Sequence, residues 1–236
     1  MFDFSGKYAV VTGGSRGIGE AIVKRFVADN AAGVAILDLL DAPYTKELDP
    51  SGERVFPLVA DISDREAVRS SFQQIYDRFG RVDFMINNAG VTRDAMFHKM
   101  NDENWDTVVD VNLGGSYNCT RQVINKMREQ ESGRIVFVSS IAIYGAAAGL
   151  SNYAAAKSAL IALTRTLALE QHRKSITVNC VIPGGIDTDM VTHLKDLPKD
   201  LRMGKPEEVA SLICYLCTDE ASFISGACID INGGLR

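Results

Sequence analysis

Short apolar stretches alternate with longer amphipathic stretches along almost the whole chain. Seven of the short stretches are rich in β-branched and aromatic residues, and we predict strands at Tyr8–Val11, Val34–Leu37, Val55–Val59, Phe84–Ile86, Ile135–Val138, Thr177–Ile182 and Ala227–Ile231. Helical spacing of apolar residues predicts helices at Ile18–Asp29, Arg65–Phe79, Asn104–Arg128, Tyr153–Glu170 and Pro206–Thr218. Such alternation predicts an α/β fold: one doubly wound, seven-stranded parallel sheet with helices on both faces, spanning residues 1–236.

Two segments interrupt the regular alternation. Leu39–Arg54 contains Pro43, Pro50 and Gly52, so any helix joining the second and third strands must be short or absent. Asp187–Lys205 is a polar stretch of loop and short helix after the sixth strand. We expect it to act as a lid over the substrate.

Composition narrows the range of partners. The net charge is −5 and the pI is about 5.3, which disfavours nucleic-acid binding because that function needs clustered Lys and Arg. No apolar run is long enough to span a bilayer, and the N-terminal stretch does not read as a signal peptide. We therefore expect a cytoplasmic protein acting on a small molecule, without membrane or nucleic-acid partners.

Five cysteines are scattered through apolar stretches, as expected for reduced thiols in a cytosolic core: Cys119, Cys180, Cys214, Cys217 and Cys228. Cys214 and Cys217 form a C-x-x-C, but a zinc site needs two further ligands at suitable spacing, and the sequence offers none. We predict no metal site and interpret this pair as helix packing.

A glycine-rich loop follows the first predicted strand and leads into a helix. Its residues Thr12-Gly13-Gly14-Ser15-Arg16-Gly17-Ile18-Gly19 have G-x-x-x-G-x-G spacing. Glycines allow the backbone to approach a pyrophosphate, and the free N–H groups of a helix N-terminus favour an anion. Alone the loop is also compatible with a tight turn that only packs the helix on the strand.

Asp38 ends the second predicted strand, where a carboxylate can accept hydrogen bonds from the adenosine ribose. Its charge would repel the 2′-phosphate of NADP(H), so we favour NAD(H) as the cofactor. NADP(H) stays possible because the Arg16 guanidinium could pair with that phosphate. Asp38 could also be a simple cap or surface residue.

Several further motifs occur in a fixed order, and with them the chain resembles the short-chain dehydrogenase/reductase family over essentially its whole length. The resemblance rests on the glycine loop, Asp61-Ile62, Asn87-Asn88-Ala89-Gly90, Asn112, Ser140, Tyr153-Ala154-Ala155-Ala156-Lys157 and Pro183-Gly184. It implies a Rossmann fold and a nicotinamide cofactor contacting Gly13, Ser15, Arg16, Gly17, Ile18, Gly19, Asp38, Asp61, Ile62, Asn88, Ala89, Gly90, Tyr153, Lys157, Pro183, Gly184, Ile186 and Thr188.

Within that set, the resemblance implies that Asp61 accepts from the adenine amino group and that Thr188 bonds the nicotinamide carboxamide. Taken alone, Asp61 could equally cap the helix beginning near Asp64, and Asn87–Gly90 could be an ordinary turn.

Tyr153 and Lys157 are one helical turn apart, so their side chains project from one face. A free tyrosine has a pKa of about 10 and holds its proton too tightly for efficient exchange at pH 7. A nearby ammonium, together with the oxidised nicotinamide, would favour the phenolate. Alone, the pair also fits an exposed helical pair, but the resemblance implies catalysis by Asn112, Ser140, Tyr153 and Lys157.

In that assignment Ser140 orients the substrate oxygen, and Lys157 also holds the nicotinamide ribose. Asn112 would hold a water that links Lys157 to bulk solvent. The reaction would be the reduction of a ketone to an alcohol, or the reverse oxidation.

The runs around Asn88, Tyr153 and Pro206 most resemble 3-oxoacyl-[acyl-carrier-protein] reductases and acetoacetyl-CoA reductases. A 3-oxoacyl thioester is therefore our leading substrate class, with acyl carrier protein as a possible partner contacted by Arg173 and Lys174, although Glu131 has the wrong sign for it. The alternatives are a dehydrogenase of a hydroxysteroid, sugar-derived or other secondary alcohol, and a non-catalytic NAD sensor or scaffold.

The resemblance also implies a homotetramer or homodimer. Its candidate interface helices are Asn104–Arg128 and Tyr153–Glu170.

Overall fold

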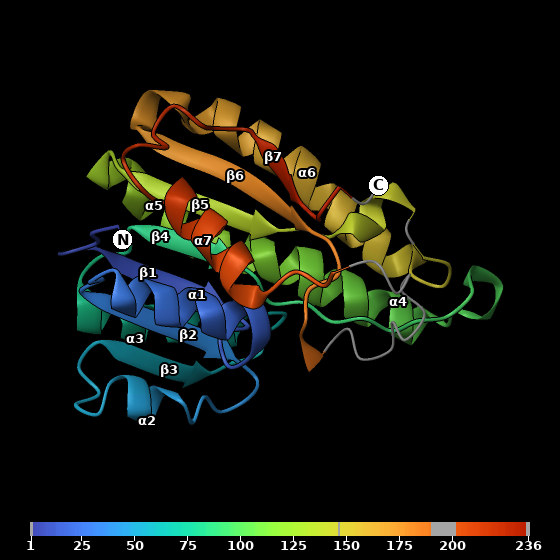
Figure 1. Ribbon diagram of the computed structural model, residues 1–236, viewed down its shortest axis with the longest axis horizontal. Helices are drawn as coiled ribbons and strands as arrows, with labels where there is room; N and C mark the ends of the chain where they lie inside the picture. The colour runs from blue at the N-terminus through green and yellow to red at the C-terminus, as the bar shows by residue number, and fades with distance from the viewer. Residues whose placement is uncertain (1, 146, 190–201, 235–236) are drawn as a thin grey trace.

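A computed structural model describes residues 2–145, 147–189 and 202–234. Seven parallel strands form one sheet in the order β3-β2-β1-β4-β5-β6-β7 (Figure 1). They are β1 (Tyr8–Thr12), β2 (Gly33–Asp38), β3 (Val55–Val59), β4 (Phe84–Asn87), β5 (Gly133–Val138), β6 (Ile176–Pro183) and β7 (Cys228–Ile231). The doubly wound parallel sheet expected from the sequence is thereby confirmed.

Helices cover both faces of this sheet. The α-helices are α1 (Gly17–Ala28), α2 (Thr45–Leu48), α3 (Arg65–Phe79), α4 (Asp102–Val109), α5 (Ser116–Gln130), α6 (Ser151–Gln171) and α7 (Pro206–Leu216). A π-helical segment, η2 (Asp110–Gly115), joins α4 to α5, and single 3₁₀ turns form η1 (Phe97–Lys99), η3 (Ile141–Tyr144) and η4 (His172–Lys174). The helix predicted at Asn104–Arg128 is therefore three consecutive pieces with a widened turn in the middle.

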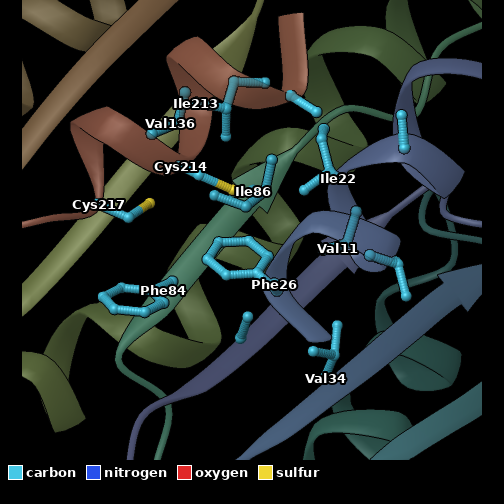
Figure 2. Packing of buried hydrophobic residues seen from close by; sticks show 14 of the residues in the cluster. Val11, Ile22, Phe26, Val34, Phe84, Ile86, Val136, Ile213, Cys214 and Cys217 are labelled. Atoms are coloured by element: carbon cyan, nitrogen blue, oxygen red, sulfur yellow. The ribbon is translucent and has the colours of Figure 1, made fainter. Parts of the chain in front are cut away.

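Two buried clusters hold the layers together. On one face α1 and α7 pack side by side, and the rings of Phe4, Phe26 and Phe84 contact one another, with centroids 5.2 to 5.5 Å apart; Figure 2 shows Phe26 beside Phe84. Cys214 and Cys217 project from α7 into the same cluster, as the sequence interpretation required. On the other face α3, α5 and α6 cover the sheet through residues such as Phe72, Val123 and Leu160.

The edge strand β3 departs from the continuous burial that we expected of the strands. Only Val55 is buried, whereas the other residues of β3 are partly or fully exposed, and Val59 is 67% exposed. The reason is its position at the edge of the sheet, since β3 pairs only with β2. Pro57 fits an edge strand because proline has no N–H to donate to a second neighbouring strand. As expected, the segment before it contains only the four-residue helix α2.

The strand order places a crevice at one end of the sheet. From β1 the chain continues outward through β2 to β3, and then returns to β4 on the other side of β1. The loops that follow β1 and β4 therefore diverge, which is the point where doubly wound sheets bind ligands. The expected lid at 187–205 lies only partly within the described residues, where Ile186 bridges to Gly204.

Among the described residues, no helix is both long and apolar enough to cross a membrane.

Two strand valines test how much the buried face contributes to stability. Val34 on β2 is fully buried, whereas Val59 on neighbouring β3 is mostly exposed. We expect Val34→Ala to lower the free energy of unfolding by about 2 kcal/mol, through lost burial and a residual cavity. Val59→Ala should change it by about 0.5 kcal/mol or less. Urea unfolding followed by circular dichroism measures both, and equal effects would contradict this layer assignment.

Candidate active site

A cavity of about 390 Å³ opens at the carboxyl ends of the strands, on both sides of β1. Seventeen of the residues predicted from the sequence line it: Gly13, Arg16, Gly17, Ile18, Asp38, Asp61, Ile62, Asn88, Ala89, Gly90, Ser140, Tyr153, Lys157, Pro183, Gly184, Ile186 and Thr188. Ser15, Gly19 and Asn112 do not line it; they lie behind its wall and support it.

The glycine loop is shaped by contacts that leave no room for side chains. Gly13 has φ +65°, and a Cβ on it would lie 2.8 Å from the Ala89 Cα. A Cβ on Gly19 would overlap the Gly13 carbonyl. No side chain caps the N-terminus of α1, so its first N–H groups are available at the cavity. This bare cradle fits a pyrophosphate.

Asp38 marks the end of the cavity that would receive adenosine. One carboxylate oxygen accepts from the Ser15 N–H at 2.9 Å and the other from the Leu40 N–H at 3.2 Å. The Ser15 hydroxyl donates to the Leu40 carbonyl, and Tyr44 donates to the Gly14 carbonyl at 2.7 Å. The irregular segment after β2 therefore fastens the glycine loop to the Asp38 strand, a role the sequence did not reveal.

Two exposed leucines that we did not predict follow Asp38 in the cavity wall. Leu39 and Leu40 are about half exposed and offer no positive charge there. The Arg16 guanidinium lies 3.9 Å from the Asp189 carboxylate. A sequence signal was available, since both leucines directly follow Asp38, the carboxylate that we predicted to contact the ribose.

Asp61 also lies in the wall, and the cap of α3 is a different residue. Asp64 accepts from the N–H groups of Glu66 and Ala67, whereas Asp61 accepts from the Ser63 N–H and hydroxyl. The alternative that Asp61 caps this helix is therefore wrong. Its neighbour Ile62 packs where a Cβ on Gly115 would clash, which fixes the wall to the π-helical segment.

Asn88 connects the two central strands. Its amide nitrogen donates to the carbonyls of Thr12 and Gly13, both at 3.0 Å, while the Thr12 hydroxyl accepts from the Asn88 and Ala89 N–H groups. The turn after β4 is therefore locked to the glycine loop. It is not an independent turn.

The proposed acid–base residues converge deeper in the cavity. Tyr153 and Lys157 extend from the first turns of α6, with the Lys157 ammonium 5.7 Å from the centre of the Tyr153 ring. Ser140 ends the loop after β5 and is close enough to hydrogen-bond the Tyr153 hydroxyl. Lys157 is 2% exposed and donates to the Val138 carbonyl at 2.8 Å.

Burial controls the protonation of this pair. It raises the pKa of Tyr153, an effect that the Ser140 hydrogen bond opposes and the Asp94 charge reinforces. Burial also lowers the pKa of Lys157 to about 8. Without cofactor the protein therefore favours a neutral phenol, and the positive charge of an oxidised nicotinamide would act together with the Lys157 ammonium in favour of the phenolate.

Asn112 occupies the π-helical segment beside Lys157. Its amide nitrogen donates to the carbonyls of Val91 and Val108, at 2.9 and 2.8 Å, while its buried oxygen has no donor among the described residues. A Cβ on Gly90 would lie 2.5 Å from that oxygen and 3.2 Å from the Lys157 Nζ. The missing side chain at Gly90 leaves a polar space, and the free oxygen fits an acceptor role toward a water.

The remaining wall comes from the segment after β6. A Cβ on Gly184 would meet the Asn232 backbone at 2.8 Å, and the Thr188 methyl group lies 3.2 Å from the Cβ position of Gly17. Thr188 therefore lies directly against the glycine loop, and both line the cavity.

A further residue, Asn152, was not assigned a role from sequence. It is fully buried, and its amide donates to the carbonyls of Arg93 and Asn104 at 3.1 Å. It thereby anchors the start of α6, just before Tyr153. As a buried amide it left only a weak sequence signal, because its partners are backbone atoms far along the chain.

Arg173 and Lys174 do not border the cavity. They lie in η4, before β6 begins, whereas the cavity meets the other end of that strand, about 25 Å away. Lys174 also pairs with Glu131 at 2.9 Å. Contact of Arg173 and Lys174 with a carrier protein stays a prediction.

The described residues contain no group of three or more His, Cys, Asp or Glu side chains arranged to hold a metal ion.

Comparisons with known proteins agree with this geometry. A short chain dehydrogenase family model matches residues 7–198. The chain is 39% identical to the 3-oxoacyl-[acyl-carrier-protein] reductase FabG of Thermotoga maritima, covering 98% of each, and 38% identical to Nodulation protein G of a Rhizobium species, covering 100% of this chain and 99% of that one. The structure of levodione reductase superposes with a TM-score of 0.90 at 30% identity, covering 98% of each chain.

The shifted pKa of Lys157 has a consequence for stability. The usual pKa of a lysine is 10.5, so between about pH 8 and 10.5 the unfolded chain keeps a proton that the folded chain has lost. The contribution of Lys157 to stability therefore rises with pH in this window. We expect the free energy of unfolding of the parent, minus that of Lys157→Met, to increase by about 2 kcal/mol between pH 8 and 10.

Subtracting the free energy of unfolding of the variant removes the contribution from the titration of the tyrosines and cysteines, which both proteins share. Urea titrations at a series of pH values provide the measurement. A difference that stays flat would contradict a charged, desolvated Lys157 amine.

Proposed function

The chain belongs to the short-chain dehydrogenase/reductase family, and we propose that it reduces the ketone of 3-oxoacyl thioesters with NADH through Tyr153, Ser140, Lys157 and Asn112. Family membership makes it an oxidoreductase that uses a nicotinamide cofactor. The observation that carries the residue assignment is the convergence of Tyr153, Ser140 and Lys157 in the cavity beside the bare glycine loop.

When bound, the reduced nicotinamide supplies a hydride to the carbonyl carbon. The residues of this chain handle the proton and the oxygen. The Tyr153 hydroxyl donates its proton to the oxygen that becomes the alcohol, and the Ser140 hydroxyl donates a hydrogen bond to the same oxygen as its charge develops. Alcohol oxidation uses the same contacts in reverse.

Lys157 and Asn112 help to return a proton to the Tyr153 hydroxyl. The Lys157 ammonium lies against the Tyr153 ring and favours the phenolate electrostatically once the tyrosine has given up its proton. Beside it, the free Asn112 oxygen and the space at Gly90 suit a water that passes a proton inward from solvent. A Lys157 pKa of about 8 leaves the amine able to release and regain a proton near neutral pH.

Asp38 supports NAD(H) over NADP(H). Its two oxygens are held by backbone N–H groups at the adenosine end, and Leu39 and Leu40 beside it supply no cation for a 2′-phosphate. A phosphate there would face a carboxylate without a compensating charge, which is costly in a partly buried site. Arg16 is the one nearby cation in the described wall, and it lies toward Asp189.

The substrate class rests on relatives. Several similar proteins are 3-oxoacyl-[acyl-carrier-protein] reductases. Their names support a 3-oxoacyl thioester as the substrate and acyl carrier protein as a partner that presents it. The similarity to levodione reductase favours a second candidate, a small cyclic ketone or other secondary alcohol. We expect a homodimer or homotetramer in either case.

The catalytic assignment predicts the behaviour of Tyr153→Phe. Removing the hydroxyl removes the proton donor, so turnover should fall by about 10³-fold or more, whereas NADH binding should change little. Tyr117→Phe is the matched control, because Tyr117 is half exposed on α5 and should keep its activity. Steady-state rates and NADH fluorescence titration measure the two effects. Substantial turnover by Tyr153→Phe would refute the assignment.

The cofactor assignment predicts a preference for NADH, measured as the ratio of kcat/KM values for NADH and NADPH. Replacing both Asp38→Ala and Leu39→Arg removes the repulsion and supplies a guanidinium, and should shift that ratio about 10²-fold toward NADPH. Leu39→Ala alone is the control and should retain the NADH preference. A parent protein that prefers NADPH would contradict the argument from Asp38.

The substrate assignment predicts faster NADH oxidation with acetoacetyl-CoA and 3-oxoacyl carrier protein than with steroid ketones or cyclic diketones. A single panel at equal concentrations decides between them. Activity confined to the diketones or steroids would replace the thioester with the second candidate.

A further inference from the structure

Two cysteines that lie far apart in the sequence are neighbours in the sheet. Cys180 on β6 and Cys228 on β7 are directly paired residues of adjacent parallel strands. Paired residues project from the same face of a sheet, and strands lie about 4.8 Å apart, within the Cα separation of disulfides. Both side chains belong to the cluster beneath α6. Cys180 is fully buried, and Cys228 is partly exposed.

The two thiols have opposite character. A hydrogen bond between them lowers the pKa of Cys228 to about 7, against the effect of its partial burial, and the Arg165 guanidinium lowers it further while Asp230 opposes. The same hydrogen bond and burial raise the pKa of Cys180. An accessible thiolate beside a protected thiol is the arrangement of redox-sensitive cysteine pairs.

The other three cysteines differ. Cys119, Cys214 and Cys217 are buried, and burial raises the pKa of each thiol. The C-x-x-C that stands out in the sequence is therefore unreactive, whereas a pair separated by 47 intervening residues has the reactive geometry.

Cys180 also lies next to the proposed catalytic group. Its thiol is within electrostatic range of the Lys157 ammonium and donates to the Val181 carbonyl at 3.6 Å, and that carbonyl also accepts from the Ser139 N–H at 2.8 Å. Ser139 in turn donates its hydroxyl to the Lys157 carbonyl at 2.9 Å. A displacement of the Cys180 sulfur toward β7 would therefore alter the contacts that hold Lys157 and the loop carrying Ser140.

We propose that Cys180 and Cys228 form a peroxide-oxidisable pair, and that their disulfide reversibly lowers hydride transfer at the adjoining site. The Cys228 thiol loses its proton to solvent and the thiolate attacks hydrogen peroxide: an S–O bond forms, the O–O bond breaks, and the hydroxide that leaves takes up the released proton to become water. The Cys180 sulfur then attacks the Cys228 sulfenic acid, and the departing hydroxide takes the Cys180 proton.

In sum, two thiols and one hydrogen peroxide give one disulfide and two waters. A dithiol reductant returns both thiols by exchange. Disulfide formation requires the two sulfurs to approach to about 2 Å, which withdraws the Cys180 sulfur from Lys157 and from the Val181 carbonyl that Ser139 also contacts. The proposal extends beyond the hydride transfer itself, and its covalent step does not depend on it.

The test treats the full-length protein with hydrogen peroxide, blocks remaining thiols with iodoacetamide, and identifies the linked peptides by mass spectrometry. We expect one disulfide joining Cys180 to Cys228, with Cys119, Cys214 and Cys217 still reduced. NADH-dependent activity should fall at least about five-fold and return with dithiothreitol. This five-fold loss corresponds to about 1 kcal/mol in the activation barrier.

Cys228→Ser should retain parent activity and lose the sensitivity to peroxide, whereas Cys217→Ala should remain as sensitive as the parent. The proposal is overturned if no Cys180–Cys228 disulfide forms, if it forms without loss of activity, or if Cys228→Ser is inactivated as fast as the parent. Because mass spectrometry detects the disulfide without turnover, its absence is distinct from a failure of the proposed reductase function.

Discussion

The desolvated amine of Lys157 is the constraint on which the rest of the site depends. An ammonium that is 2% exposed is tolerated because it donates to the Val138 carbonyl, lies over the Tyr153 ring and borders the polar space at Gly90. Each of these contacts comes from a different element: β5, α6 and the turn after β4. The sheet order brings these elements together at one edge. The fold therefore determines the protonation of Tyr153 and Lys157.

Support for this arrangement extends outward through backbone contacts. Asn152 anchors the start of α6, Asn88 joins the turn after β4 to the glycine loop, and Asn112 widens the helix beside Lys157. Buried asparagine amides repeatedly join backbone carbonyls of separate segments, which fixes the loops without adding charge near the reacting atoms. A buried lysine destabilises the fold, and a fixed polar frame offsets part of that cost.

Most of the layer architecture was predictable because parallel strands buried on both faces are written as continuous apolar runs. The site residues were predictable because the order of their motifs along the chain is specific; of the predicted site residues, all but Ser15, Gly19 and Asn112 line the cavity. Side-chain pairing was not predictable. Asp64 instead of Asp61 caps α3, Lys174 pairs with Glu131, and Cys180 meets Cys228 only because β7 adds to the sheet beside β6. Each depends on three-dimensional distances that sequence spacing does not contain.

Direct hydride transfer from the cofactor to a carbonyl carbon in this cavity is tested by following a deuterium label from NADH to the product. NADH carrying deuterium at the transferable position of the nicotinamide is supplied with acetoacetyl-CoA in ordinary water. We expect one deuterium on the carbinol carbon of the product for each NADH oxidised, and a solvent-derived proton on the oxygen of the product. An alcohol whose carbinol carbon carries only solvent hydrogen, or NADH oxidation without alcohol, would contradict it.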